Sequence, residues 1–324
     1  MDLRAQHQQL APQLASNPFQ RPLHLQSQQT EERLQGDIYA VLEQPFSLVG
    51  AALQDGNNWC DILILHLNVK RCLASSDQPK QVLNIHIGRK IEQPLADASL
   101  FQFDYRAVSA NTDYLEVHLN ADEGPLGTSL YRIELQVVAL DAARSFLHLS
   151  YSYTYGLAAN LAMRGYLTSL GRDKRGFSVT GHNENDEPIY IDGMRGVIER
   201  NTMRYYLAVE AYLSALGTPP AEQLEQRLAH WQSAVEHYPQ LRELEPEEYL
   251  SMKREEIQRQ VSDSAVLAYV LAPQLRLGGN EITHQRNTLG VLQHLYFHTA
   301  RTQQLLLTHE GLILTYHHLR NAVQ

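Results

Sequence analysis

The strongest constraint on the fold is a series of segments between residues 81 and 155 in which apolar and polar residues alternate. Successive side chains of a strand point to opposite faces, so this alternation is typical of strands that are buried on one side. In the last segment, SFLHLSYSYTYG, the residues on one face are Leu147, Leu149, Tyr151, Tyr153 and Tyr155. The residues between them are polar, and the segment therefore predicts a strand with an aromatic, apolar face.

Four further segments alternate in the same way: QVLNIHIGRK, SLFQFDYRAVS, DYLEVHLNAD and SLYRIELQVVAL. Short connections rich in turn residues separate them, which favours an antiparallel meander because parallel neighbours need long crossovers. Phe101, Phe103 and Tyr105 share a face in one of them, and Tyr131 and Ile133 share a face in another. We expect one apolar face of the sheet to be covered and the other to meet solvent.

Helices are predicted at both ends of the meander. GDIYAVLEQP begins as a strand, PFSLVGAALQD and WCDILILHL are short helices, and NVKRCLASS is again a strand. After the last strand, GLAANLAMRGYLTSLG has apolar residues at helical spacing, Leu161 among them, and ends at Gly171, a typical helix C-cap. We expect this helix, 157–170, to cover the apolar face.

The remaining regions differ in composition. Residues 1–33 are rich in Gln and Pro, and we interpret them as a flexible N-terminal arm. The main domain is 34–181, and long helical patterns mark 182–260 as a helical extension. The segment 261–324 contains no lysine and few charges, and we treat it as an appended segment of uncertain order.

The order of strand, two short helices, meander and helix resembles the helix-grip fold of the START-like (SRPBCC) superfamily, which includes lipid-transfer proteins and polyketide cyclases. The resemblance rests on GDIYAVLEQPFSLVGAAL, NWCDILILHLNVKRC, GPLGTSLYRIELQVV and FLHLSYSYTYGLAANLAMRGYLTSLGRDKRGFSV, and the last of these is similar to bacterial members of unassigned function. It implies an α+β fold in which a curved antiparallel sheet of about seven strands wraps a long helix, followed by a helical C-terminal extension.

The resemblance also implies a cavity for a hydrophobic ligand between the sheet and the long helix, although the same aromatic residues could simply pack a core. We predict binding or transport of an apolar small molecule or lipid. The residues expected to line the cavity are Phe101, Phe103, Tyr105, Tyr131, Ile133, Leu149, Tyr151, Tyr153, Tyr155 and Leu161. The alternatives are a cyclase- or hydrolase-type enzyme that uses the same pocket and a helical protein-interaction module.

We favour a binding protein over an enzyme, and we predict no catalytic residue, because Asp104, Glu116 and Glu134 fall on the polar face of their strands. We also expect no cofactor and no metal, since His294 and His298 stand four residues apart without the glutamate of a HExxH motif. A transient contact with a membrane or with another protein is a further alternative.

The only two cysteines, Cys60 and Cys72, lie at either end of one apolar stretch. We favour a disulfide between them, which would suit the periplasm after removal of a signal peptide, over two buried thiols in the cytoplasm. The net charge is −9 and no stripe of Lys and Arg occurs, which argues against a nucleic-acid partner. No apolar run approaches the roughly 20 residues of a transmembrane helix.

Overall fold

The computed structural model describes residues 2–75, 81–124, 127–156 and 174–271, and of residues 263–271 only the backbone. The chain divides into two compact units, Met1–Gln260 and Val261–Gln324. Everything below concerns the first unit. Within the described residues, no helix is both long enough and apolar enough to cross a membrane.

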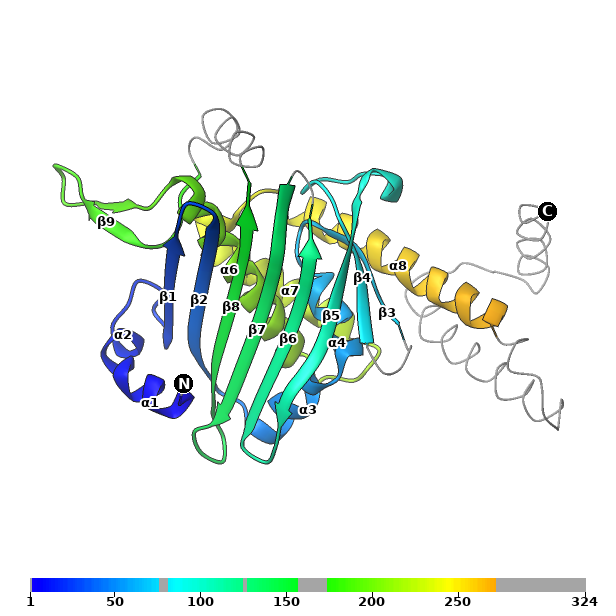
Figure 1. The fold of residues 1–324 in the computed structure, drawn as a ribbon, viewed down its shortest axis with the longest axis horizontal. Helices are drawn as coiled ribbons and strands as arrows, with labels where there is room; N and C mark the ends of the chain where they lie inside the picture. The colour runs from blue at the N-terminus through cyan, green and yellow to red at the C-terminus, as the bar shows by residue number, and fades with distance from the viewer. Residues whose placement is uncertain (1, 76–80, 125–126, 157–173, 272–324) are drawn as a thin grey trace. The chain divides into compact units, whose positions relative to one another are not determined.

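One antiparallel sheet of eight strands dominates this unit, in the order β1-β2-β8-β7-β6-β5-β4-β3 (Figure 1). Strands β4 to β8 follow one another as the predicted meander. The α+β helix-grip architecture is confirmed, with one strand more than the seven expected. The strands are β1 (Leu23–Gln29), β2 (Arg33–Leu42), β3 (Val69–Ala74), β4 (Gln81–Ile87), β5 (Ser99–Ala110), β6 (Tyr114–Glu123), β7 (Thr128–Ala139) and β8 (Ser145–Tyr155).

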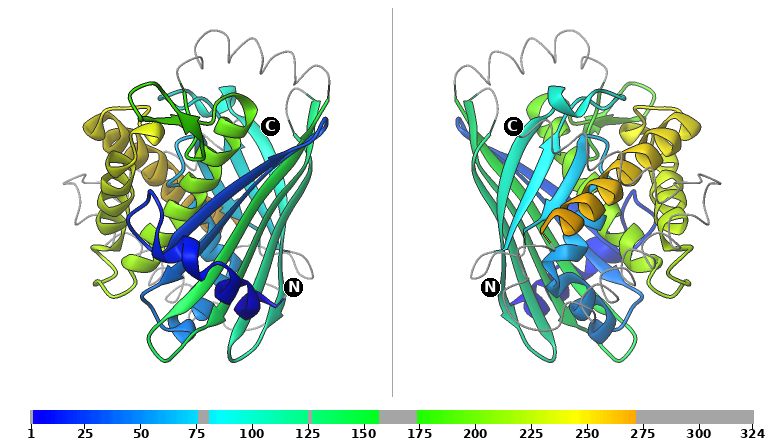
Figure 2. Two further views of the ribbon diagram at one scale, coloured as in Figure 1. Left: turned by 90° about the vertical axis from the view of Figure 1, so that its left-hand side faces the viewer. Right: turned by 90° about the vertical axis from the view of Figure 1, so that its right-hand side faces the viewer.

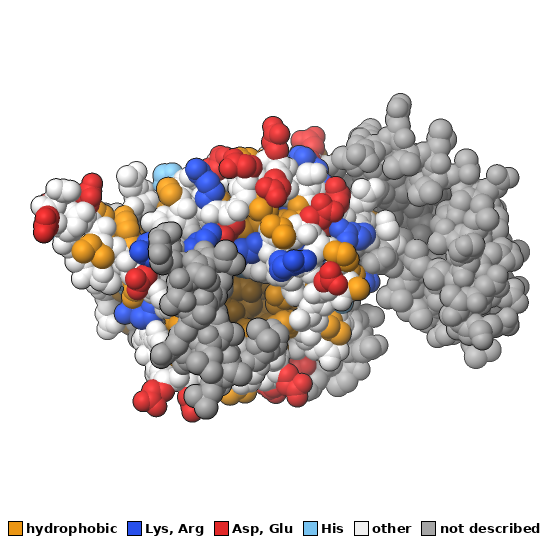
Figure 3. All heavy atoms as spheres, turned by 90° about the horizontal axis from the view of Figure 1, so that it is seen from above, with side chains coloured by type: hydrophobic (Ala, Val, Ile, Leu, Met, Phe, Trp, Pro, Cys, Tyr) orange, Lys and Arg blue, Asp and Glu red, His pale blue; other side chains and the backbone are white. Residues whose placement is uncertain are grey.

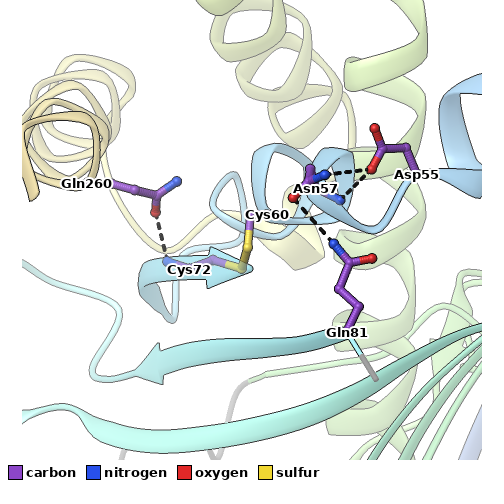
Figure 4. Close-up of a disulfide and its surroundings, with 6 residues drawn as sticks. All are labelled: Asp55, Asn57, Cys60, Cys72, Gln81 and Gln260. Carbon is purple, nitrogen blue, oxygen red and sulfur yellow. Dashed lines mark hydrogen bonds between the residues drawn. A yellow bond between two sulfur atoms is a disulfide. The ribbon is translucent and has the colours of Figure 1, made fainter. Parts of the chain in front are cut away.

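Two short helices, α3 (Phe46–Gln54) and α4 (Gly56–Leu63), connect β2 to β3. Asp55 caps α4 by accepting a hydrogen bond from the backbone N–H of Asn57 at 2.9 Å. A disulfide joins Cys60 of α4 to Cys72 of β3, with 5.1 Å between their Cα atoms (Figure 4). The predicted disulfide is therefore present, and it fixes α4 against the edge strand of the sheet.

The long helix that lies against the sheet is α6 (Gly193–Ser214), which contacts β1, β2 and β8 (Figure 2). Gly36 of β2 makes a close approach possible, because a Cβ atom there would lie 2.3 Å from the Thr202 hydroxyl oxygen. The sequence places this helix in the extension 182–260, whereas it packs on the sheet itself. The helix predicted at 157–170 lies outside the described residues.

Among the remaining elements, α7 and η3 pack on α6. Helix α8 begins at Pro246 and passes β3, where Lys70 of the strand and Lys253 of the helix both bind the Glu256 carboxylate, at 2.9 and 2.7 Å. This buried ionic contact attaches the helix to the edge of the sheet. Besides α6, the described elements that follow β8 in the chain are the hairpin of β9 (Val179–His182) and β10 (Pro188–Tyr190), α7 (Gln223–His237), the 3-10 turn η3 (Pro239–Leu241) and α8 (Pro246–Leu271). A further 3-10 turn, η1 (Leu95–Asp97), precedes β5.

The prediction that residues 1–33 form a flexible arm is wrong. They contain the helices α1 (Leu3–Gln9) and α2 (Ala11–Ala15) and the edge strand β1, which pairs with β2. Three leucines, Leu3, Leu10 and Leu14, pack on Tyr39 and Phe146 at the outer face of the sheet. The abundant glutamines obscured this spacing of leucines, and part of the outer face is therefore covered by protein rather than by solvent.

Candidate functional site

Nine of the ten predicted lining residues are described, and they lie on the inner face of β5, β7 and β8; Leu161 lies outside the described residues. Their rings form a continuous cluster toward the end of the sheet where β8 ends, which we call the upper end. Tyr131 stacks on Tyr153 with 5.1 Å between ring centroids, and Phe101 meets Tyr131 edge-on at 5.4 Å. Tyr151 follows at 5.8 Å from Tyr153. The sheet thus contributes an aromatic wall.

Helix α6 contributes the opposite wall through Tyr205, whose ring meets Tyr151 edge-on at 5.0 Å and stacks on His66 at 4.7 Å. Tyr205 is enclosed by these rings, yet it retains accessible surface, as does Tyr131. Both side chains are therefore partly accessible. Figure 3 shows a hollow with a hydrophobic floor when the molecule is viewed from the upper end.

Some of the predicted lining tyrosines serve the protein's own structure. The hydroxyl of Tyr155 donates to the carbonyl of Thr30 at 2.8 Å, and that of Tyr105 donates to the carbonyl of Gln54. These two hydroxyls hold the strand connection before β2 and the end of α3 in place. Their bonding makes Tyr105 and Tyr155 poor candidates for ligand recognition.

The hydroxyls of Tyr151, Tyr153 and Tyr205 form no hydrogen bond with any residue that the structure describes. Burial raises the pKa of each of the three phenols, and neighbouring tyrosines raise it further. All three are therefore neutral at physiological pH and can donate one hydrogen bond each. None of the three hydroxyl oxygens is among the fully buried unpaired atoms of the described residues, so each retains accessible surface from which it can donate to a ligand.

His66 completes the wall at the connection between α4 and β3. Its Nδ1 accepts a hydrogen bond from the backbone N–H of Asn68 at 3.2 Å, which assigns the proton of the neutral imidazole to Nε2. Burial lowers the pKa of His66 well below its usual value, and the nearby cations Arg204 and Lys253 lower it further. Among the described residues the buried Nε2 has no hydrogen-bond partner.

Sequence reasoning missed both Tyr205 and His66. The stretch MRYYLAVEAYL carried a signal, because it is a long helical run with paired aromatics and only two charged residues. Nothing in it showed which surface the helix would cover. His66 lies at the end of an apolar run, but its stacking partner comes from a helix almost 140 residues later in the chain.

The charged residues of the strands lie on the outer face, as their alternation predicted. Asp104 and Glu134 are exposed, and Glu116 accepts a hydrogen bond from Tyr114 at 2.8 Å on that same side. Within the parts of the chain that the structure describes, no group of three His, Cys, Asp or Glu residues could hold a metal ion. The groups around the hollow are phenols and one neutral imidazole, which suit binding by hydrogen bonds.

No protein-family model matches the chain, and no curated protein matches it. Solved structures with related folds include norcoclaurine synthase from Thalictrum flavum, at 14% identity over 45% of this chain and 93% of that one, with a TM-score of 0.30. The aromatase/cyclase Zhui from Streptomyces sp. R1128 shares 16% identity over 46% of this chain and 86% of that one, with a TM-score of 0.28.

A START superfamily protein from Mycobacterium smegmatis shares 10% identity over 44% of this chain and 92% of that one, with a TM-score of 0.28. The likenesses cover less than half of this chain and concern the fold alone. The description of this fold rests on the chain's own element order and on the position of α6 against the sheet.

Proposed function

We propose that this protein binds a hydrophobic small molecule with a polar group in the hollow between α6 and the upper end of the sheet. The observation that supports this most is the set of three phenol hydroxyls, from Tyr151, Tyr153 and Tyr205, that have no hydrogen-bond partner among the described residues. A ligand with an acceptor group would satisfy them. A pocket of mostly aromatic surface with a few convergent polar groups is typical of small-molecule sites.

Apolar burial would provide most of the affinity. A ligand that loses about 300 Å² of apolar surface gains about 7 kcal/mol at about 25 cal/mol per Å², before the cost of association is subtracted. The rings of Phe101, Tyr131 and Tyr153 offer both faces and edges, which favours planar or ring-bearing ligands. The hydroxyls would contribute orientation more than affinity.

Binding is favoured over catalysis by the protonation states of the lining groups. An acid–base catalyst needs a group whose pKa lies near the working pH. The pKa values of Tyr151, Tyr205 and His66 are all shifted away from neutrality, upward for the phenols and downward for the imidazole. These groups therefore act as fixed hydrogen-bond donors at neutral pH.

The test is a fluorescence titration with N-phenyl-1-naphthylamine, an uncharged aromatic probe that emits strongly only in apolar surroundings. We expect saturable binding of one probe per chain. The substitution Tyr205→Trp would occupy part of the hollow and weaken probe binding about tenfold. The matched control is Tyr212→Trp, two turns further along α6, where the ring packs under the Arg227 guanidinium at 4.2 Å.

Circular dichroism of each variant checks that the fold is retained. Equal binding by the Tyr205→Trp and Tyr212→Trp variants, or no saturable binding by the unmodified protein, would contradict the proposal. Native mass spectrometry of protein purified without detergent would then identify any molecule that accompanies it.

A further inference from the structure

Three cations meet one carboxylate close to the hollow. Lys90, in the connection between β4 and β5, binds Glu243 with 2.5 Å between Nζ and Oε1. Lys174, which precedes β9, binds the other oxygen of the same carboxylate. Arg204 of α6 approaches Oε1 to 3.0 Å and also donates to the carbonyl of Leu241 at 3.1 Å.

The carboxylate neutralises only part of this positive charge. Burial alone would raise the pKa of Glu243, but Arg204 and Lys90 lower it to about 2, so the group stays ionised. Burial and the nearby Arg204 lower the pKa of Lys90 to about 8, an effect that Glu243 opposes without cancelling. Burial is the larger of the two causes, and the excess of positive charge follows from the ion pairs themselves, in which three cations share one carboxylate.

The cluster adjoins the aromatic hollow. Arg204 directly precedes Tyr205 in α6, and both Arg204 and Lys90 act electrostatically on His66, which stacks on Tyr205. Lys90 follows the end of β4, and β5 begins on the same side, since Ile87 pairs with Ser99. This is the upper end of the sheet, and Figure 3 shows Lys and Arg side chains along one edge of the hydrophobic hollow.

The three cations differ in exposure. The side chain of Arg204 is 1% exposed, whereas those of Lys90 and Lys174 are 27% and 28% exposed. Each lysine ammonium has three donors, of which the described structure uses one for Glu243. Arg204 alone would balance the Glu243 charge, so the two lysines add positive charge that this carboxylate does not neutralise.

We propose that Lys90 and Lys174 bind the anionic head of an amphipathic ligand, a carboxylate, sulfonate or phosphate, while its apolar part occupies the hollow. This inference rests on the proposed function and adds the charge of the ligand to it. Charge-assisted hydrogen bonds are stronger than neutral ones, and they strengthen further beside a low-dielectric space. The ligand class is therefore an aromatic or lipid-like acid rather than a neutral hydrocarbon.

The experiment compares two probes that differ only in one anionic group. 8-Anilino-1-naphthalenesulfonate carries the rings of N-phenyl-1-naphthylamine with an added sulfonate. We expect the unmodified protein to bind the sulfonate more tightly. Lys90→Met and Lys174→Met should each weaken its binding about threefold and the double variant about tenfold, while the neutral probe binds as before.

Two controls keep the test decisive if a variant fails to fold. Arg254 of α8 forms an exposed ion pair with Glu225 of α7. The substitution Arg254→Met removes this positive charge and should leave the binding of both probes unchanged. Raising the salt concentration should weaken sulfonate binding to the unmodified protein and leave the neutral probe unchanged.

The outcomes separate the two proposals. If both probes bind and neither the lysine substitutions nor salt affect the sulfonate selectively, the anion site is refuted and the hollow stands. If neither probe binds, the proposed function fails, and the anion site fails with it. Selective loss of the sulfonate in the lysine variants supports both.

Discussion

Two neighbouring stripes of α6 are built in contrasting ways. Ile198, Thr202 and Tyr205 are spaced to share one stripe, and Glu199, Met203, Tyr206 and Glu210 share the next. On the first stripe the Tyr205 hydroxyl has no hydrogen-bond partner among the described residues. On the second, the adjacent Tyr206 is fully buried, accepts from Arg21 at 2.7 Å and donates to Glu210 at 3.1 Å.

The contrast is between a hydroxyl that hydrogen-bonds to other parts of the protein and one that has no such partner among the described residues. On the Glu199 stripe, polar atoms are matched with donors and acceptors from segments far apart in the chain. On the first stripe, Ile198 and Thr202 are fully buried against β2, and only the Tyr205 hydroxyl lacks such a partner in the described part of the chain. We take Tyr205 as part of a binding surface and the second stripe as structural, and the predictions below test that division.

The largest effect is expected at Glu199, whose fully buried carboxylate accepts hydrogen bonds from the Ser27 hydroxyl at 2.6 Å, from the backbone N–H groups of Phe177 and Ser178 at 2.6 and 2.9 Å, and from the Ser178 hydroxyl at 2.7 Å. Glu199→Gln removes the negative charge and replaces one acceptor oxygen with an NH₂ group, which the Ser27 and Ser178 hydroxyls can meet only by turning to accept. We expect the free energy of unfolding, measured in urea, to fall by about 4 kcal/mol.

The matched substitution on the other stripe is Thr202→Val, which retains the size of the side chain and removes its hydroxyl. That hydroxyl donates only to the carbonyl of Ile198 at 2.8 Å, within the helix. Its removal should cost no more than about 1 kcal/mol. Equal losses at Glu199 and Thr202 would show that the two stripes contribute alike to stability.

The second-largest expected effect is a loss of folding stability at low pH, caused by protonation of Glu210 on the second stripe. Burial alone would raise the pKa of Glu210, but hydrogen bonds from His230 and Arg21 lower it to about 2, against 4.5 for an ordinary glutamate. Between about pH 2 and pH 4.5 the Glu210 carboxyl is therefore protonated in the unfolded chain and ionised in the folded chain. Stability from this group is complete above about pH 4.5 and disappears as the pH falls toward 2, a loss of about 3 kcal/mol.

Urea unfolding at several pH values measures this loss, and Glu210→Gln provides the comparison. The variant should be less stable than the unmodified protein at pH 6 and should lose less stability on acidification. Parallel pH profiles for the two proteins would assign the acid sensitivity to other carboxylates and remove Glu210 from the argument.

The sequence predicted the faces of the strands, but it did not predict that α6 packs on the sheet. Strand alternation is a local property, so Phe101, Tyr131 and Tyr153 could be placed on one face before any tertiary contact was known. The same pattern could not show that the hydroxyls of Tyr105 and Tyr155 are bound by backbone carbonyls, because those carbonyls lie in other elements. Sharing a face is therefore predictable from sequence, whereas availability for a ligand is not.

The choice of gripping helix depends on a long-range contact. Helix α6 approaches β2 where Gly36 leaves space for Thr202, and these two residues are far apart in sequence. A glycine in a strand suggests a close approach without identifying the partner. The edge strand β1 was not predicted for a related reason. Its sequence is largely polar, and it forms a strand because it pairs with β2.

The smallest effect is the most direct comparison of the stripes, because Tyr205 and Tyr206 are adjacent and the same substitution applies to both. Tyr206→Phe removes the hydroxyl that lies between Arg21 and Glu210 and should lower the free energy of unfolding by about 1–2 kcal/mol. Tyr205→Phe removes a hydroxyl without a described partner and should change it by less than about 0.5 kcal/mol. A loss at Tyr205 as large as at Tyr206 would mean that the protein itself satisfies that hydroxyl, and the strongest reason to place a ligand beside it would disappear.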